Sequence, residues 1–337
     1  MKLCMFFAFL VIVQLELSIS LVESINLQQP LQAITKAPKV ILPAEDYLSL
    51  THYLNSCPDV EGIIHQKTKA WFKKDYTLAA SLIRLHFHDC AVRGCDGSIL
   101  LNHPGSERRA KASRTLRGFE VIDDIKAEIE RRCPKTVSCT DILTVVARDA
   151  TVLLGGPFWE VTLGRKDGKT SIAKEAEMVP QGYENVTTLI EFFKSKGLNE
   201  LDLVILSGSH TIGRSSCYSI LHRLAKPDPT LDIQYWKQLR KKCRRGWDLV
   251  DLDVTTPKTF DIAYFTNLQK KLGLLSTDSA LYTNQMTAAF VDATVSQPSL
   301  FESQFAASMV KLGNVQVLTR KNEGEIRLNC NSVNRNY

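Results

Sequence analysis

The sequence predicts a mainly α-helical fold with a minor β element. Apolar side chains recur at the three- and four-residue spacing of amphipathic helices over most of the chain from Cys57 onward. Only residues 161–166 favour a short strand, and they follow the helix-stopping run Gly155-Gly156-Pro157. Because cysteines extend from Cys57 to Cys330 with no low-complexity linker between them, we expect a single domain over residues 47–337.

The first 46 residues precede this domain. Residues 1–24 contain an early lysine, an apolar run that Gln14 interrupts, and small serines, which is the pattern of a secretory signal peptide. The apolar run is shorter than the roughly 18 residues that a membrane-spanning helix needs, so a signal anchor is the less favoured alternative. Residues 25–46 carry three prolines and no steady periodicity, and we interpret them as an N-terminal extension, either a loosely attached tail or a propeptide.

Helices are expected in order along the domain. In the first of them, Val60, Ile63 and Ile64 share one face, and in the third, Phe119 and Ile122 do so. Residues 167–183 are rich in turn formers and are predicted to be a loop. The predicted helices cover residues 60–71, the first half of 81–101, 119–132, 140–154, 186–196, 231–243, 260–272, 285–296 and 300–312.

Composition and charge limit the function classes. The apolar content of 44% and the charged content of 23% are typical of a globular protein with a sizeable core. The formal net charge of +6 suits either a solvated surface or attraction to acidic polymers, and we favour the solvated surface. No nucleic-acid partner is predicted, and no second long apolar segment follows the signal peptide, so we expect no membrane association after its cleavage.

The cysteine count points to an oxidising compartment. Of nine cysteines, Cys4 lies in the predicted signal peptide, which leaves eight that are able to form four disulfides. Eight cysteines allow 105 pairings, and sequence spacing favours only Cys90 with Cys95. We therefore predict a secreted protein, in the extracellular space, the cell wall or the vacuole, with the other pairings left open by the spacing.

The chain is organised around residues 81–101. On a helix, residues four apart share a face, so Arg84 lies directly under His88, with Phe87 beside them. A fixed cation and an imidazole directed at the same volume are able to take a proton from a bound hydroxyl and stabilise the resulting oxygen anion. After Cys90 the pattern changes to an oxygen-rich loop.

Two motifs resemble those of the class III secretory plant haem peroxidases. The run R-L-H-F-H-D-C-A-V-R-G-C-D-G-S-I-L-L at residues 84–101 is similar to their distal haem signature, and L-S-G-S-H-T-I-G at residues 206–213 is similar to their proximal one. The resemblance covers roughly residues 48–331. It implies the haem-peroxidase fold, in which two helical layers enclose a buried haem b and a minor β element accompanies them.

The resemblance also implies the roles of individual residues. Arg84 and His88 match the catalytic pair, and His210 matches the axial ligand of the haem iron. Asp278 matches the carboxylate that binds the other ring nitrogen of the axial histidine, which strengthens that ligand. Hydrogen peroxide is the implied oxidant, and small phenolic reductants are the implied donors, which reach the haem edge near Pro180. The expected form is a monomer.

Two Ca²⁺ sites and the remaining disulfides are further implications. Hard oxygen ligands in loops on both sides of the haem suit Ca²⁺, which takes six to eight of them. The distal set consists of the side chains of Asp89, Asp96 and Ser98 with the carbonyls of Val92 and Gly94. The proximal set consists of the side chains of Thr211, Asp253, Thr256 and Asp261 with the carbonyl of Thr259. The implied pairs, beside Cys90–Cys95, are Cys57–Cys133, Cys139–Cys330 and Cys217–Cys243.

One departure from the family pattern concerns the chemistry. Members usually hold an asparagine shortly before the R-G-F motif, where it orients the distal histidine. Here Ala112 falls at that position, with Ser113 next to it, so we expect an active enzyme with slower peroxide cleavage. The sequon Asn185-Val186-Thr187 predicts an N-linked glycan.

Two alternatives stay open at this point. A secreted scaffold that kept the fold but lost turnover would explain the missing asparagine. A zinc enzyme would use His86, His88, Asp89, Cys90 and Cys95, although His86 and His88 point to different helix faces and a C-x₄-C spacing in an oxidising compartment favours a disulfide.

Overall fold

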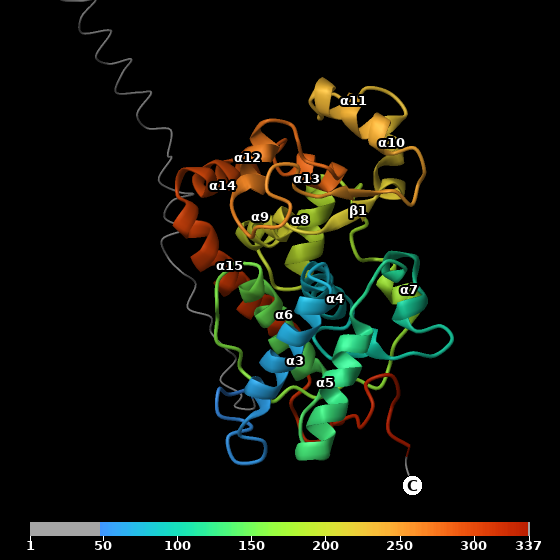
Figure 1. The fold of residues 1–337 in the computed structure, drawn as a ribbon, viewed down its shortest axis with the longest axis vertical. Helices are drawn as coiled ribbons and strands as arrows, with labels where there is room; N and C mark the ends of the chain where they lie inside the picture. The colour runs from blue at the N-terminus through green and yellow to red at the C-terminus, as the bar shows by residue number, and fades with distance from the viewer. Residues whose placement is uncertain (1–47, 336–337) are drawn as a thin grey trace, which may run out of the picture. The chain divides into compact units, whose positions relative to one another are not determined.

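The structure, a computed structural model, describes residues 48–335. The predicted signal peptide and the predicted extension at residues 25–46 lie outside these residues. The described part is mainly α-helical with a small two-stranded sheet, which confirms the predicted fold class (Figure 1). Within the described residues, no helix combines the length and the apolar character needed to cross a membrane.

The helices of the first half pack around α6. This helix is buried along nearly its whole length and contacts α3, α4 and α5. It begins at Ser138, whose side chain accepts the N–H of Asp141, and it ends where Gly155-Gly156-Pro157 stops it. The bounds are α3 (Val60–Lys74), α4 (Leu78–Val92), α5 (Phe119–Arg132) and α6 (Cys139–Leu153).

The helices of the second half pack around α9. Its apolar run from Leu201 to Leu206 is buried, and a capping box between Asn199 and Asp202 fixes its start. It contacts α8, α14 and α15, and α15 also contacts α4, so one long helix joins the two groups. The bounds are α7 (Ala173–Ala176), α8 (Val186–Ser195), α9 (Glu200–Ser207), α12 (Ala263–Gln269), α13 (Ser276–Ala280), α14 (Gln285–Ser296) and α15 (Pro298–Gly313).

A peripheral group lies between α9 and α12 in the chain. Strands β1 (Arg214–Ser216) and β2 (Leu249–Asp251) pair antiparallel, with Ser215 opposite Val250. Figure 1 shows α10 and α11 together at one end of the described fold. The remaining bounds are α10 (Leu221–Leu224), α11 (Ile233–Lys242) and the 3-10 helices η1 (Ser98–Leu100), η2 (Glu107–Arg109), η3 (Lys111–Ser113), η4 (Gly208–Thr211) and η5 (Cys217–Ile220).

The predicted strand at residues 161–166 is wrong. Leu163 forms only an isolated bridge with Ser49. The N–H of Gly164 is bound by the buried carboxylate of Asp141, so no neighbouring strand is able to accept it. The predicted loop at residues 167–183 contains the short helix α7. The helices that flank the site begin and end within a few residues of their predicted bounds.

Four disulfides lie in the described part of the chain. They include the pair that the spacing favours and the three that the family resemblance implies. The Cys139–Cys330 bridge joins the start of α6 to the end of the chain, a separation of 191 residues, where chain-entropy models expect the greatest stabilisation. The pairs are Cys57–Cys133, Cys90–Cys95, Cys139–Cys330 and Cys217–Cys243.

Candidate active site

Helix α4 carries the first half of the site. Arg84 and His88 lie one turn apart on it, as the spacing predicts. The guanidinium of Arg84 donates to the Ala112 carbonyl at 3.2 Å and to the Thr115 hydroxyl at 3.0 Å, so residues 112–115 fix its direction. Burial lowers the pKa of Arg84 to about 10, which leaves it a cation at neutral pH.

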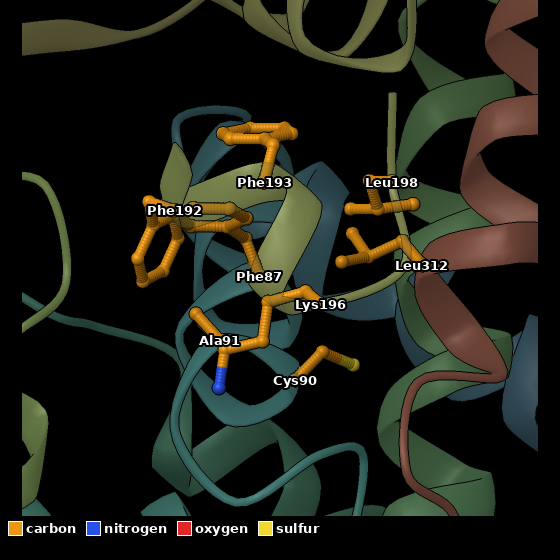
Figure 2. A pocket seen from close by; sticks show the side chains of 8 residues that line it. All are labelled: Phe87, Cys90, Ala91, Phe192, Phe193, Lys196, Leu198 and Leu312. Carbon is orange, nitrogen blue, oxygen red and sulfur yellow. The ribbon is translucent and has the colours of Figure 1, made fainter. Parts of the chain in front are cut away.

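Phe87 holds this turn of α4 against α8. Its ring stacks on Phe193 with centroids 6.3 Å apart and meets the His88 ring edge-on at 5.9 Å. Figure 2 shows Phe87 among the side chains that line a small pocket. The pocket is apolar apart from Lys196, so it serves packing rather than acid–base chemistry; its lining is Phe87, Cys90, Ala91, Phe192, Phe193, Lys196, Leu198 and Leu312.

The imidazole of His88 is neutral, and within the described residues no hydrogen bond holds its Nδ1. Burial, with Arg84 as a second cause, holds its pKa well below the usual value, so it is a proton acceptor at neutral pH. Its Nδ1 is buried and has no hydrogen-bond partner among the described residues. Within the described range 48–335, the Ser113 hydroxyl and both carboxyl oxygens of Glu107 are also buried without a hydrogen bond. Ala112 supplies only its carbonyl, to Arg84, which agrees with the absence of an orienting amide.

His210 carries the second half of the site and is held differently. It lies in η4, directly after α9. Its Nδ1 is 2.8 Å from the Asp278 carboxylate, which also accepts the Tyr264 hydroxyl at 3.0 Å and the Leu275 N–H at 2.8 Å. Asp278 is fully buried, whereas the His210 side chain is one-third exposed. Since the carboxylate accepts a hydrogen bond from Nδ1–H, the proton stays on Nδ1 and the lone pair of Nε2 is left free to bind a metal.

These residues fit a haem iron. A neutral histidine whose second nitrogen is bound to a carboxylate is a common axial ligand, and the donor geometry of His210 meets that requirement. Helix α4, which carries His88, and helix α9, which leads directly into η4 and His210, both pack on α15. The arrangement can therefore supply an iron donor from one element and a base with an adjacent cation from another.

The distal oxygen loop fits a cation. Burial, followed by the charge of Asp96, raises the pKa of Asp89 well above its usual value, and burial also raises the pKa of Asp96. Among the described residues, the buried Ser98 hydroxyl makes no hydrogen bond of good geometry, although it lies close enough to the carboxyls of Asp96 and Glu107 to offset part of the rise that burial causes in their pKa. Gly94 has φ +92°, and a Cβ there would lie 2.6 Å from the Val315 carbonyl, so only glycine permits this turn. The Val92 carbonyl already accepts Lys196 Nζ at 2.9 Å, which uses one of its two lone pairs.

The proximal oxygen set converges more closely. The Thr211 hydroxyl has three acceptors within reach: Asp253 at 3.2 Å, Asp261 at 3.3 Å and the Thr259 carbonyl at 3.4 Å. Thr256 Oγ1 lies 3.0 Å from the same Asp261 oxygen. One hydroxyl has one proton and serves one acceptor, so this excess of oxygens suits a hard cation such as Ca²⁺.

The other predicted residues lie at the edge of the site or outside it. Pro180 is half-buried and begins a segment whose Gly182 carbonyl accepts the N–H of Thr277, next to Asp278. Asn185 is exposed at the start of α8, where its Oδ1 accepts the Thr188 N–H and caps the helix.

The zinc alternative is not supported. Donor atoms of His86, Cys90 and Cys95 lie within 4.8 Å of one another, but the two sulfurs are joined in a disulfide and are not thiolates. Burial, followed by the charge of Arg165, lowers the pKa of His86 to about 3, which is typical of a packed structural histidine.

Sequence reasoning missed several supporting residues. Tyr264 and Thr115, which hold Asp278 and Arg84, carry no local motif. Glu107 is fully buried, and burial raises the pKa of its carboxyl to about 8, with Asp96 as a further cause. Its position in an otherwise basic run gave no signal of burial. Arg327 was also missed; its guanidinium binds the carbonyls of Gly97 and Gly168 and so anchors the distal loop.

The helical fold and the two histidine environments define a haem enzyme that acts on a peroxide. The chain belongs to the peroxidase family, since the family model described as Peroxidase matches residues 64–297. It is 50% identical over 304 residues to "Peroxidase 7" of Arabidopsis thaliana, with 88% of this chain and 87% of the relative covered. It is 44% identical over 319 residues to "Peroxidase 1" of Oryza sativa subsp. japonica, with 90% and 98% covered. "Peroxidase 27" of Arabidopsis thaliana is 46% identical over 298 residues, with 85% and 92% covered.

Proposed function

We propose that this haem peroxidase oxidises small phenolic donors by one-electron steps and that Arg84, His88, His210 and Asp278 perform the roles assigned above. The hydrogen bond between His210 and Asp278 carries the proposal, because it leaves one imidazole nitrogen free as a metal donor. Haem b, when bound, supplies the redox chemistry. No observation favours a scaffold without turnover.

The distal pair handles the proton. Neutral His88 would accept a proton from one oxygen of hydrogen peroxide and deliver it to the other, which would leave as water, with the two electrons that cleavage of the O–O bond consumes coming from the haem held by His210. The cation of Arg84 stabilises the charge that develops on the departing oxygen, and its two hydrogen bonds keep it directed at that place. Both groups lie on one rigid helix, which limits the cost of orienting them.

Two Ca²⁺ ions are part of the proposal, one in the distal and one in the proximal oxygen set. Burial and the charge of Asp96 raise the pKa of Asp89, and a divalent cation would offset both effects. The cluster around Thr211 supplies more acceptors than its hydroxyl protons can serve. Because each set begins next to a site histidine, the ions would hold His88 and His210 in place.

Phenolic donors are expected at Pro180. Its carbonyl would accept the donor hydroxyl, while the backbone link from Gly182 to Thr277 holds this segment on the axial side of the site.

We further propose secretion after removal of residues 1–24, an extension at residues 25–46, a domain over residues 47–337, a monomeric form and a glycan on Asn185. The free amide of Asn185 suits the glycan, because only its oxygen is used in capping.

The test is an absorption spectrum of the purified haem-loaded protein, followed by turnover of guaiacol. We expect a strong Soret band that changes on addition of hydrogen peroxide and returns when guaiacol is added. In His210→Ala the axial donor is missing, so the band shifts, and added imidazole restores it. A His210→Ala protein with an unaltered spectrum would show that the iron is bound elsewhere and would overturn the proposed site.

A further inference from the structure

A cluster of basic side chains surrounds the end of α11 and lies outside the site. Its members, Lys237, Arg240, Lys241, Lys242, Arg244 and Arg245, are all exposed. From the sequence we favoured a solvated basic surface and did not single out this concentration of charge. The helix packs Tyr235, Trp236 and Leu239 inward, so its basic residues are left on the outer face.

Ion pairs and stabilisation of the end of α11 account for only some of these six cations. Asp248 pairs with Arg245 at 3.2 Å, and Asp251 lies 3.7 Å from Lys242. Lys237, Arg240, Lys241 and Arg244 form no ion pair within the described part of the chain, although the Arg240 guanidinium lies 4.9 Å from the centre of the Trp236 ring. Basic residues in the last turn favour a helix, but Arg244 and Arg245 follow its end. Six cations against two carboxylates leave an excess of positive charge.

Two exposed aromatic rings stand beside these cations. Tyr218 is 62% exposed and Trp247 is 63% exposed. The Tyr218 ring covers Gly246, where a Cβ would lie 2.4 Å from the ring, and the Arg245 guanidinium is 5.5 Å from the centre of Trp247. We name these eight side chains, the six cations with Tyr218 and Trp247, the basic–aromatic surface.

The backbone under this surface is fixed. The Cys217–Cys243 disulfide joins the two segments that carry the rings. The N–H of Tyr218 donates to the Gly246 carbonyl at 2.8 Å, and the N–H of Cys217 donates to the Asp248 carbonyl at 2.8 Å. A rigid surface loses little entropy on binding, so exposed rings held in this way are suited to recognition.

We propose that the basic–aromatic surface binds an acidic polysaccharide, a polymer of uronate sugars. Each uronate ring offers a carboxylate for a lysine or arginine and a flat C–H face for Tyr218 or Trp247. The four disulfides place the partner in an oxidising compartment, which favours an extracellular polymer over nucleic acid. Such binding would hold the enzyme on a polymer while its active site stays free, independently of the phenolic donors proposed above.

The experiment measures binding of the haem-loaded protein to a short, defined polygalacturonate in buffer without free Ca²⁺. We expect saturable binding that sodium chloride weakens and that a fully methyl-esterified polymer of the same length does not show. Replacing the three cations that have neither an ion pair nor an aromatic contact (Lys237→Gln, Lys241→Gln and Arg244→Gln together) should weaken binding about tenfold, since each exposed pair contributes a factor of roughly 1.5 to 5. Trp247→Ala should weaken it with no change in the salt dependence.

The matched control removes the same charge elsewhere. Lys69, Lys73 and Lys169 are also exposed, and their combined replacement by glutamine should leave binding within about twofold. Both triple variants should keep the Soret band and guaiacol turnover. Equal loss in the two variants would show attraction to net charge alone and would overturn the proposal. Tighter binding to a single-stranded oligonucleotide or to phosphatidylserine vesicles than to polygalacturonate would overturn it too.

Discussion

The two imidazoles of the site differ in how their second nitrogen is held. Nδ1 of His210 is bound to Asp278, and that carboxylate is in turn fixed by Tyr264 and the backbone of Leu275. Nδ1 of His88 is buried with no partner among the described residues. The proximal tautomer is therefore set by the protein, whereas packing alone, through the Phe87 ring, orients the distal one.

This difference corresponds to two separate requirements of the reaction, one for the metal ligand and one for the base. A metal donor must keep one nitrogen unprotonated throughout, so a permanent carboxylate partner benefits it. A base that accepts and returns a proton at Nε2 needs orientation of its other nitrogen, and a missing partner costs rate rather than cofactor binding. The two halves should thus respond differently when each is altered.

The largest effect is expected from removing the distal base. His88→Leu should slow peroxide cleavage at least about 10³-fold, because it deletes the proton acceptor while Arg84 and His210 remain. The measurement is stopped-flow absorbance of the Soret band after mixing with hydrogen peroxide. The control is an unchanged resting spectrum, which shows that the haem is still bound through His210. A loss below about tenfold would mean that His88 is not the base.

Removal of calcium tests whether the distal and the proximal half of the site each depend on a bound ion. At a free concentration 100 times the dissociation constant, each site would contribute about 2.7 kcal/mol, so chelation should lower Tm by roughly 5 °C or more. Added Ca²⁺ should restore Tm, and Mg²⁺ should not, because it demands a smaller octahedral site.

The two oxygen sets should not lose order equally on chelation. Without an ion, Asp253 still accepts hydrogen bonds from Thr255, Thr256 and Asn267, and Asp89 still accepts them from the N–H groups of Gly97 and Ile99. Only the distal set, however, places a second buried carboxyl, Asp96, where its charge opposes ionisation of Asp89. Amide exchange should therefore rise more in residues 89–98 than in residues 253–261. A larger rise in residues 253–261 would contradict the view that the distal loop depends more strongly on its ion than the proximal loop does.

Replacing the proximal carboxylate by an amide tests the stronger half. Asp278→Asn keeps the shape but weakens the donor strength of His210, so the reduction potential of the iron should rise and peroxide cleavage should slow about 10- to 100-fold. Tyr264→Phe is the matched control, since it removes one hydrogen bond from the same carboxylate and should shift the potential less. Equal shifts in the two variants would refute the special role of the carboxylate.

Local patterns predicted the helices and the distal pair because both depend on short spacings. Arg84 and His88 are four residues apart, and α14 begins and ends at the predicted residues. No spacing links His210 to Asp278, 68 residues later, and only the family resemblance supplied that partner. The strand at residues 161–166 failed because the carboxylate of Asp141, more than twenty residues away, takes a backbone N–H that a sheet would need. Glu107 was missed for the same reason, since its burial is decided by distant residues.

The smallest effect is expected from repairing the distal half. Ala112 is half-buried and packs against the same apolar cluster as Phe87, and its carbonyl already accepts a hydrogen bond from Arg84, so an asparagine there would bring an amide close to the catalytic pair. One hydrogen bond to Nδ1 of His88 is worth about 1 kcal/mol, so Ala112→Asn should speed peroxide cleavage up to about fivefold by stopped flow. Ser113→Asn is the less favourable choice, because Ser113 is almost fully buried and the larger side chain would overpack its surroundings. Ala112→Leu is the matched control: it adds similar volume without an acceptor and should give no gain. If neither asparagine variant is faster than this leucine variant, the missing amide does not limit His88, and the contrast between the two halves has no kinetic consequence.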